Sequence, residues 1–145
     1  MNQQLEEKYP VLYKITGKAM EVHAEYKPGL VESAYESALK YLLTQEGYKV
    51  EQQVYLPMYW KDVLLDQHYR IDLLINGAVI VELKAVRYIQ AEHRNQLWSY
   101  MRLTRQRYGM LINFGADSLY CEWYERNPYT GEINRLLQGK DAKQI

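Results

Sequence analysis

Three charged residues lie inside two apolar segments in the middle of the chain. Asp72 belongs to segment 69–75, and Glu82 and Lys84 belong to segment 79–84. The β-branched residues on either side of an Asn-Gly-Ala sequence predict two strands joined by a turn. Charged side chains are rare inside strands unless they are paired, solvated or bound to a metal. Because a strand directs Glu82 and Lys84 to the same face, two carboxylates and a lysine can gather there, which suits divalent-cation chemistry on a phosphate.

The same pattern has a second interpretation. An antiparallel strand with one solvated face also alternates polar with apolar residues. Asp72, Glu82 and Lys84 would then form a surface ion-pair cluster that contributes little to stability. The spacing alone leaves both interpretations open.

The composition limits the class of protein. With 145 residues, 48% of them hydrophobic and 25% charged, the chain is typical of one folded domain, residues 1–145. Its net charge of +0 argues against a tight, autonomous DNA-binding protein. The single cysteine, Cys121, excludes an internal disulfide and a cysteine-cluster metal site. We see no membrane-spanning segment and no signal-peptide pattern, so we expect a cytoplasmic protein.

Apolar periodicity and turn residues predict an α/β (α+β) fold, with helices packed on a sheet. Segment 61–68 is expected to be a polar turn or a short hairpin, and a final hairpin is expected around the Asn-Pro dipeptide near position 127. We expect helices at 11–26, 30–46 and 89–105, and strands at 49–59, 69–75, 79–84, 108–114, 119–125 and 132–136.

Two helices carry further candidate residues. In the 30–46 helix, Glu32 and Glu36 fall within the apolar stripe, where a carboxylate needs a metal, a basic group or a helix terminus as its partner. Glu32 also lies in the first turn, where it favours the helix dipole, so both interpretations stay open for it. A structural role is favoured for Glu36. In the 89–105 helix, Gln96 and Tyr100 share one face and could support a site or be satisfied core residues.

Four motifs follow one another along the chain. They are Gly29 to Tyr35 (Gly-x-x-Glu-x-x-Tyr), Asp72 with Glu82-Leu83-Lys84, Gln96 to Tyr100 (Gln-x-x-x-Tyr), and the late strand at 107–114. Taken in this order, they resemble the motifs of the GxxExxY family of the PD-(D/E)XK nuclease superfamily, and the resemblance covers roughly residues 11–115. One departure is Ile71, which stands where the superfamily motif has proline.

The resemblance implies a restriction-endonuclease-like mixed sheet flanked by helices. The C-terminal hairpin lies outside it and could cover a sheet edge or form a homodimer contact. The resemblance also implies Mg²⁺ or Mn²⁺ held by Asp72, Glu82 and the carbonyl of Leu83, with Glu32 completing the site directly or through water. Lys84 would activate the attacking water and stabilise the developing charge on the phosphate. Gln96 and Tyr100 would support the site or contact the substrate.

Three functions are therefore open. The first is a metal-dependent nuclease that hydrolyses phosphodiester bonds of DNA, alone or with a partner protein, with an exonuclease-like mode as one option. The second is a catalytically inactive module that binds nucleic acid or a partner, which the neutral charge and the Tyr59-Trp60 pair favour. The third is a structural protein whose acidic cluster is a solvated face. A membrane association is not expected.

The catalytic interpretation depends on the register of the two central strands. Asp72 and Glu82 share a site only if their side chains face the same side of the sheet. A two-residue turn would place them on opposite faces, because a shift of one residue reverses every side chain. We therefore expect a connection with an odd number of residues, such as 76–78, which places the two acids directly opposite each other.

Overall fold

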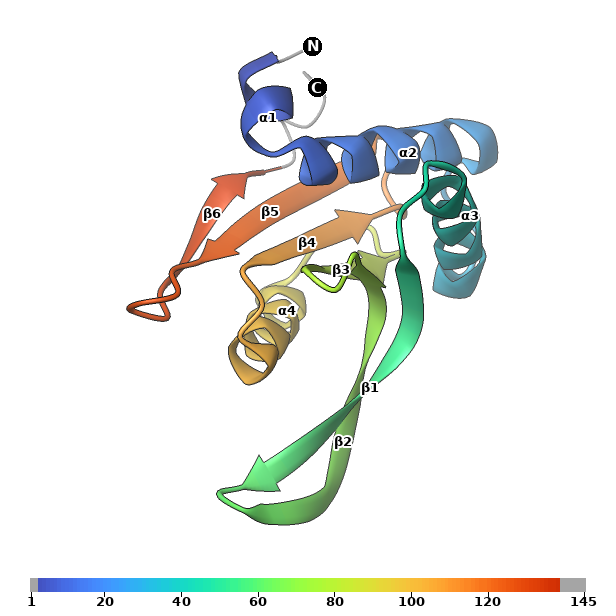
Figure 1. Cartoon of the computed structure of the whole chain (residues 1–145). Helices are drawn as coiled ribbons and strands as arrows, with labels where there is room; N and C mark the ends of the chain where they lie inside the picture. The colour runs from blue at the N-terminus through green and yellow to red at the C-terminus, as the bar shows by residue number, and fades with distance from the viewer. Residues whose placement is uncertain (1–2, 139–145) are drawn as a thin grey trace.

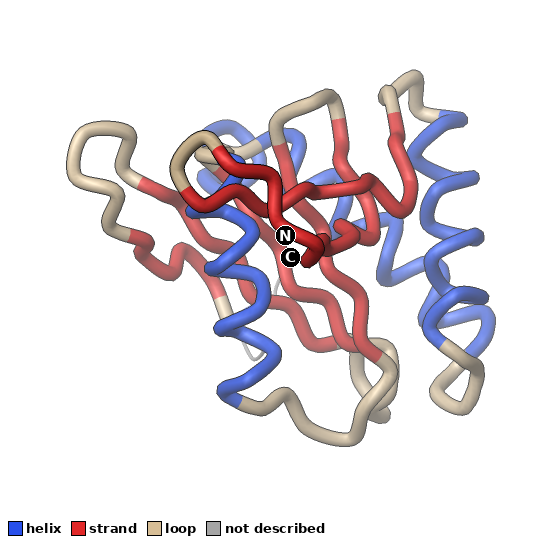
Figure 2. Tube along the Cα trace, turned by 90° about the horizontal axis from the view of Figure 1, so that it is seen from below, coloured by secondary structure: helices blue, strands red, loops and turns tan. Residues whose placement is uncertain are grey.

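A six-stranded mixed sheet with helices on both faces forms the protein, as the computed structural model of residues 3–138 shows (Figures 1 and 2). The strand order is β1-β2-β3-β4-β5-β6, and only β3 and β4 run parallel. This arrangement confirms the expected α+β fold. The elements are α1 (Gln3–Lys8), α2 (Pro10–Tyr26), α3 (Glu32–Gln45), β1 (Val50–Trp60), β2 (Val63–Ile75), β3 (Val79–Lys84), α4 (Ala91–Thr104), β4 (Tyr108–Asn113), β5 (Tyr120–Arg126) and β6 (Ile133–Leu137).

Each face of the sheet has its own apolar core. The helices α2 and α3 cover one face, where Ile15, Tyr35 and Trp123 are fully buried. The helix α4 covers the other face through Leu97 and Met101. Because β3 lies in the middle of the sheet and connects to β4 through α4, it is covered on both sides, as parallel strands usually are.

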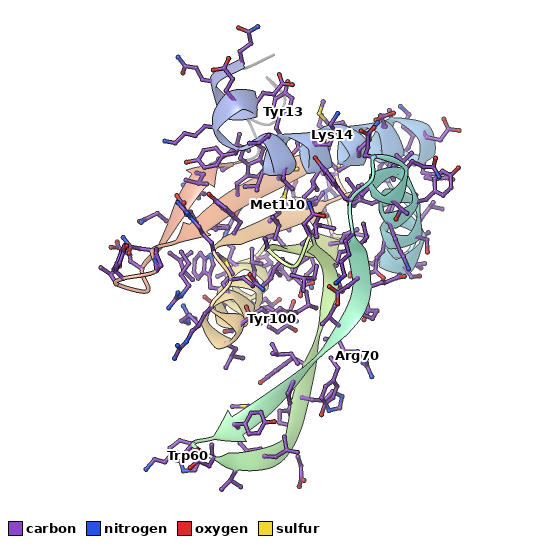
Figure 3. All side chains as sticks on the ribbon, viewed as in Figure 1. Tyr13, Lys14, Trp60, Arg70, Tyr100 and Met110 are labelled. Atoms are coloured by element: carbon purple, nitrogen blue, oxygen red, sulfur yellow. The ribbon has the colours of Figure 1, made fainter. Side chains whose placement is uncertain are left out.

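The hairpin formed by β1 and β2 extends well past the rest of the sheet (Figure 1). Segment 61–68 was expected to be a polar turn or a short hairpin. It forms a hairpin, with a tight turn at residues 61–62, but β2 begins at Val63 and pairs with β1 over a much greater length than expected. Pairing with the neighbouring strand overrides the weak local propensity of this polar segment. Figure 3 shows Trp60 at the tip. Large apolar side chains exposed on this hairpin are Tyr55, Tyr59, Trp60, Val63 and Leu64.

The other expected elements are confirmed to within a few residues at each end, including the C-terminal hairpin of β5 and β6. The short helix α1 was not expected, and α3 begins at Glu32 rather than at residue 30. Within residues 3–138, no helix is both long enough and apolar enough to cross a membrane.

A buried ion pair attaches α4 to the sheet. Glu122 of β5 has no exposed surface, and Arg94 of α4 donates hydrogen bonds to it from Nε (2.8 and 3.0 Å) and from Nη2 (2.7 Å). The hydroxyl groups of Tyr120 (2.6 Å) and Tyr124 also donate to this carboxylate. Burial alone would raise the pKa of Glu122, but these four donor groups hold it below its usual range.

We expect Arg94→Met to lower the free energy of unfolding by about 3 kcal/mol, because the substitution leaves a buried carboxylate without its cation. The double variant Arg94→Met/Glu122→Gln should recover most of this loss, since no unpaired charge is left. The amide oxygen accepts from one tyrosine, and the amide NH2 can donate to the hydroxyl oxygen of the other. Urea denaturation measures both values. Equal stability of the single and double variants would contradict a charge effect.

Candidate active site

The register between β2 and β3 places the two acids opposite each other. Ile75 pairs with Val79 across a three-residue connection, and Leu73 pairs with Val81. The next pair in this register is Asp72 and Glu82. The sequence-based expectation for the connection is confirmed.

The two strands diverge at this pair, and side chains replace the ladder between them. The backbone N–H of Asp72 donates to Oε2 of Glu82 (3.1 Å), and the backbone N–H of Leu83 donates to Oδ2 of Asp72 (2.9 Å). Both carboxylates are therefore held by backbone donors between the strands. Because the N–H and C=O of one residue point to the same side of a strand, the carbonyl of Leu83 also faces β2.

At Asp72, the alternation of side chains along β2 between the two faces of the sheet is interrupted. Leu73 packs against the cluster under α2 and α3, whereas Ile71 packs against the cluster under α4. Simple alternation would put both residues on one face. On β1, the position opposite Asp72 is Gln53, whose φ of 51° lies in the left-handed region. The hairpin is thus distorted at the level of the acids.

Burial and repulsion both act on Glu82. Its side chain is only 2% exposed. Burial, and then the charge of Asp72, raise the pKa of Glu82 well above its usual range, while Lys84 opposes this shift. A pair of carboxylates in this setting either keeps a proton or attracts a cation.

The helix α4 supplies polar groups to the same place. Lys84 Nζ donates a hydrogen bond to Oε1 of Gln96 (3.0 Å). One turn later, Tyr100 is 4% exposed, and burial followed by the charge of Glu82 raises its pKa to about 12. Its hydroxyl group therefore keeps its proton at neutral pH. The expected pairing of Gln96 and Tyr100 on one face brings both toward β3.

A third acid reaches the site through glutamine side chains. Glu36 of α3 is 5% exposed, and it accepts hydrogen bonds from Nε2 of Gln52 (2.5 Å) and Nε2 of Gln53 (2.9 Å). The same Nε2 of Gln53 also donates to Oδ1 of Asp72 (3.3 Å). Burial, and then the charge of Asp72, raise the pKa of Glu36. The sequence analysis did not identify Gln52 and Gln53. The one feature that could have indicated them is a pair of adjacent amide side chains inside an expected strand.

Glu32 does not belong to this group of hydrogen-bonded side chains. It is exposed at the first position of α3, so the expectation that it lies within the buried stripe is wrong. Its charge acts on the pKa of Glu36, one turn away. The other residues of this motif build the turn before α3. The Tyr35 hydroxyl donates to the carbonyl of Lys27 (2.5 Å) and accepts from the N–H of Leu30 (3.1 Å), while Gly29 takes a φ of 124°.

Asp72 and Glu82 suit a small divalent cation. Mg²⁺ prefers oxygen ligands, takes one or two carboxylates and keeps several waters. The two acids and the carbonyl of Leu83 provide such a set, and their mutual repulsion would be relieved by a cation. Within the described part of the chain, however, no group of three or more His, Cys, Asp or Glu side chains is close enough to hold a metal.

Comparison with known families agrees with this arrangement. The family model of the PD-(D/E)XK nuclease superfamily matches residues 9–125, most of the chain. The chain belongs to the PD-(D/E)XK nuclease superfamily. No curated protein and no solved structure matches it. The mixed sheet is consistent with this superfamily, and membership indicates a nuclease-like function.

The raised pKa of Glu82 has a consequence for stability. Its proton binds more tightly in the folded state, so the buried carboxylate destabilises the protein as pH rises through the folded-state pKa. Without metal, we expect Glu82→Gln to stabilise the protein at pH 8, and to do so less at pH 5. Thermal unfolding in EDTA measures this effect. Glu25→Gln, at an exposed position of α2, is the control, and a gain at Glu82 that does not depend on pH would contradict the prediction.

Proposed function

We propose that this protein is a metal-dependent nuclease that hydrolyses phosphodiester bonds of DNA. The observation that carries the proposal is the pair Asp72 and Glu82, held opposite each other where β2 and β3 diverge. These carboxylates and the carbonyl of Leu83 would hold Mg²⁺ or Mn²⁺. Such an ion lowers the pKa of bound water and neutralises charge on the phosphodiester.

Lys84 is the proposed catalytic cation. Its hydrogen bond to Gln96 holds the ammonium group near the acids, where it can stabilise charge that develops on the phosphate. Tyr100 keeps its proton at neutral pH because its pKa is about 12. Its hydroxyl can therefore donate a hydrogen bond but cannot act as a base. Gln96 and Tyr100 are proposed as supporting residues.

Glu36 is a better candidate than Glu32 for the acid on α3. Glu36 is connected to Asp72 through Gln53, which donates to both carboxylates. This contact fixes Oδ1 of Asp72 and so orients its other oxygen. Glu32 is exposed, so a role for it would require water between its carboxylate and the site. The narrower GxxExxY relationship is also a proposal, supported by the turn that Gly29 and Tyr35 form.

The alternative is a catalytically inactive binding module on the same fold. The observation that favours it is the exposed Tyr59 and Trp60 on the β1–β2 hairpin, together with a net charge of +0. Exposed aromatic rings can stack on bases or pack against a partner protein. The two functions differ in whether the carboxylates at the diverging strands matter for turnover.

Lys84→Met separates catalysis from binding, because it removes the charge and keeps the length of the side chain. We expect DNA cleavage with Mn²⁺ to fall by about two to four orders of magnitude, with metal binding retained and DNA affinity little changed. Asp72→Asn should lose metal binding and cleavage together. End-labelled linear, circular and single-stranded DNA would be the substrates. Equal cleavage by all three proteins would indicate a contaminating nuclease, and no cleavage of any substrate would favour the binding module.

A matched pair of substitutions distinguishes the two acids of α3. We expect Glu36→Gln to weaken Mn²⁺ binding by about tenfold. The amide has one acceptor oxygen, whereas the carboxylate offers one oxygen to Gln52 and the other to Gln53, so Gln53 is held less firmly against Asp72. Glu32→Gln should change Mn²⁺ affinity less than about threefold, in keeping with an exposed charge. Isothermal titration with Mn²⁺ measures both, with circular dichroism to check the fold. A larger effect at Glu32 would restore it as the acid of the site.

A further inference from the structure

The buried carboxylates Glu82 and Glu122 lie in one row across the sheet. Glu82 of β3 pairs with Leu111 of β4, which pairs with Glu122 of β5. All three face α4, and two strand spacings separate the acids by about 10 Å. The adjoining row starts at Lys84 and continues through Asn113 and Tyr120. The sheet therefore continues from the candidate active site directly to the Arg94–Glu122 pair.

A cavity of about 520 Å³ begins at this second row. We name it the Arg94 cavity. Its walls come from the loops after β3 and β4, from the start of α4, and from β5. The side chains that matter for its chemistry are Arg87, Tyr88, Arg94, Asp117, Ser118 and Tyr120. Its volume lies within the usual range for a small-ligand site.

Arg94 is held in one orientation by a buried carboxylate. Two tyrosine hydroxyls donate to Glu122 and fix it, and Glu122 in turn accepts hydrogen bonds from the guanidinium of Arg94. The Arg94 side chain is 27% exposed, whereas that of Glu122 is fully buried. The exposed part of a rigidly held guanidinium is a preorganised donor for a phosphate oxygen.

The remaining cavity groups fit a nucleotide. Arg87 is exposed and lies 5.6 Å from the ring centre of Tyr88, which is itself 66% exposed. An exposed ring beside a guanidinium can stack on a base while the cation contacts the phosphate. The first turn of α4 adds a positive helix dipole. Asp117 at the same cavity is the one acidic side chain that opposes binding, and Glu122 is already neutralised by Arg94.

We propose that the Arg94 cavity binds the nucleotide adjacent to the phosphodiester that is cut, with Arg94 and Arg87 on its phosphate and Tyr88 on its base. Lys84 pairs with Asn113, which lines the cavity, so this nucleotide would lie next to the candidate active site. The assignment to a substrate strand rests on the proposed nuclease function, whereas the binding of a nucleotide phosphate can be measured without any cleavage.

Thymidine 5′-monophosphate and thymidine are suitable probes, because they differ only in the phosphate. In EDTA, ¹H–¹⁵N spectra of the full chain should show that the nucleotide shifts amide signals of residues 86–89 and 115–119. Thymidine should bind about tenfold more weakly, the loss expected for charge-assisted hydrogen bonds. Equal binding of the two probes, or shifts confined to other parts of the chain, would overturn the proposal.

Arg87→Met is the decisive variant, because Arg87 is exposed and lines the cavity. We expect about tenfold weaker nucleotide binding, and no change for the control Arg135→Met, an exposed arginine of β6 outside the cavity. Arg94→Lys keeps a cation beside Glu122 but loses the planar donor geometry, so it should weaken binding similarly. Equal losses in Arg87→Met and Arg135→Met would reject the cavity.

Cleavage assays separate this inference from the proposed function. If the nuclease function holds, Arg87→Met should raise KM several-fold and leave kcat nearly unchanged, as expected for a residue that binds substrate and transition state equally. Nucleotide binding in the cavity without Asp72-dependent cleavage would contradict the nuclease function and support the nucleotide site. Asp72-dependent cleavage with no nucleotide binding in the cavity would support the nuclease function and overturn the nucleotide site.

Discussion

The divergence of β2 and β3 at Asp72 and Glu82 is the constraint on which the site depends. Backbone pairing between the two strands stops at Leu73 and Val81. Beyond that point, each carboxylate accepts a backbone N–H from the other strand. The acids thereby satisfy the groups that the missing ladder would otherwise leave unpaired. Backbone donors thus hold both carboxylates in place, although burial and the charge of Asp72 raise the pKa of Glu82.

The second structural requirement is the attachment of α4 to the sheet. Arg94 holds the helix to β5 through Glu122, and Gln96, two residues later, reaches Lys84 of β3. One helix therefore spans two rows of polar groups on the same face. The apolar residues Leu97 and Met101 of the same helix are fully buried in the core on this face of the sheet. The position of Lys84 therefore depends in part on the Arg94–Glu122 ion pair, which lies outside the candidate active site.

A net charge of +0 does not prevent a local group of cations. Lys84 at the end of β3, Arg87 in the loop after it and Arg94 in α4 follow one another in the sequence. A local cluster of donors can position a phosphate even when the whole molecule carries no excess charge. The long β1–β2 hairpin contributes exposed aromatic residues instead of charge.

The sequence alone determined the main elements and the odd-numbered connection between β2 and β3, which places Asp72 opposite Glu82. Those inferences rest on local alternation, turn residues and spacing, which a chain carries without its fold. The tertiary structure alone decided that residues 63–68 form a strand, that Glu36 rather than Glu32 faces Asp72, and that Gln53 joins the two acids. It also paired Arg94 with Glu122, 28 residues apart. Each of these depends on contacts between segments distant in sequence, and local propensity contains no information about which partners meet.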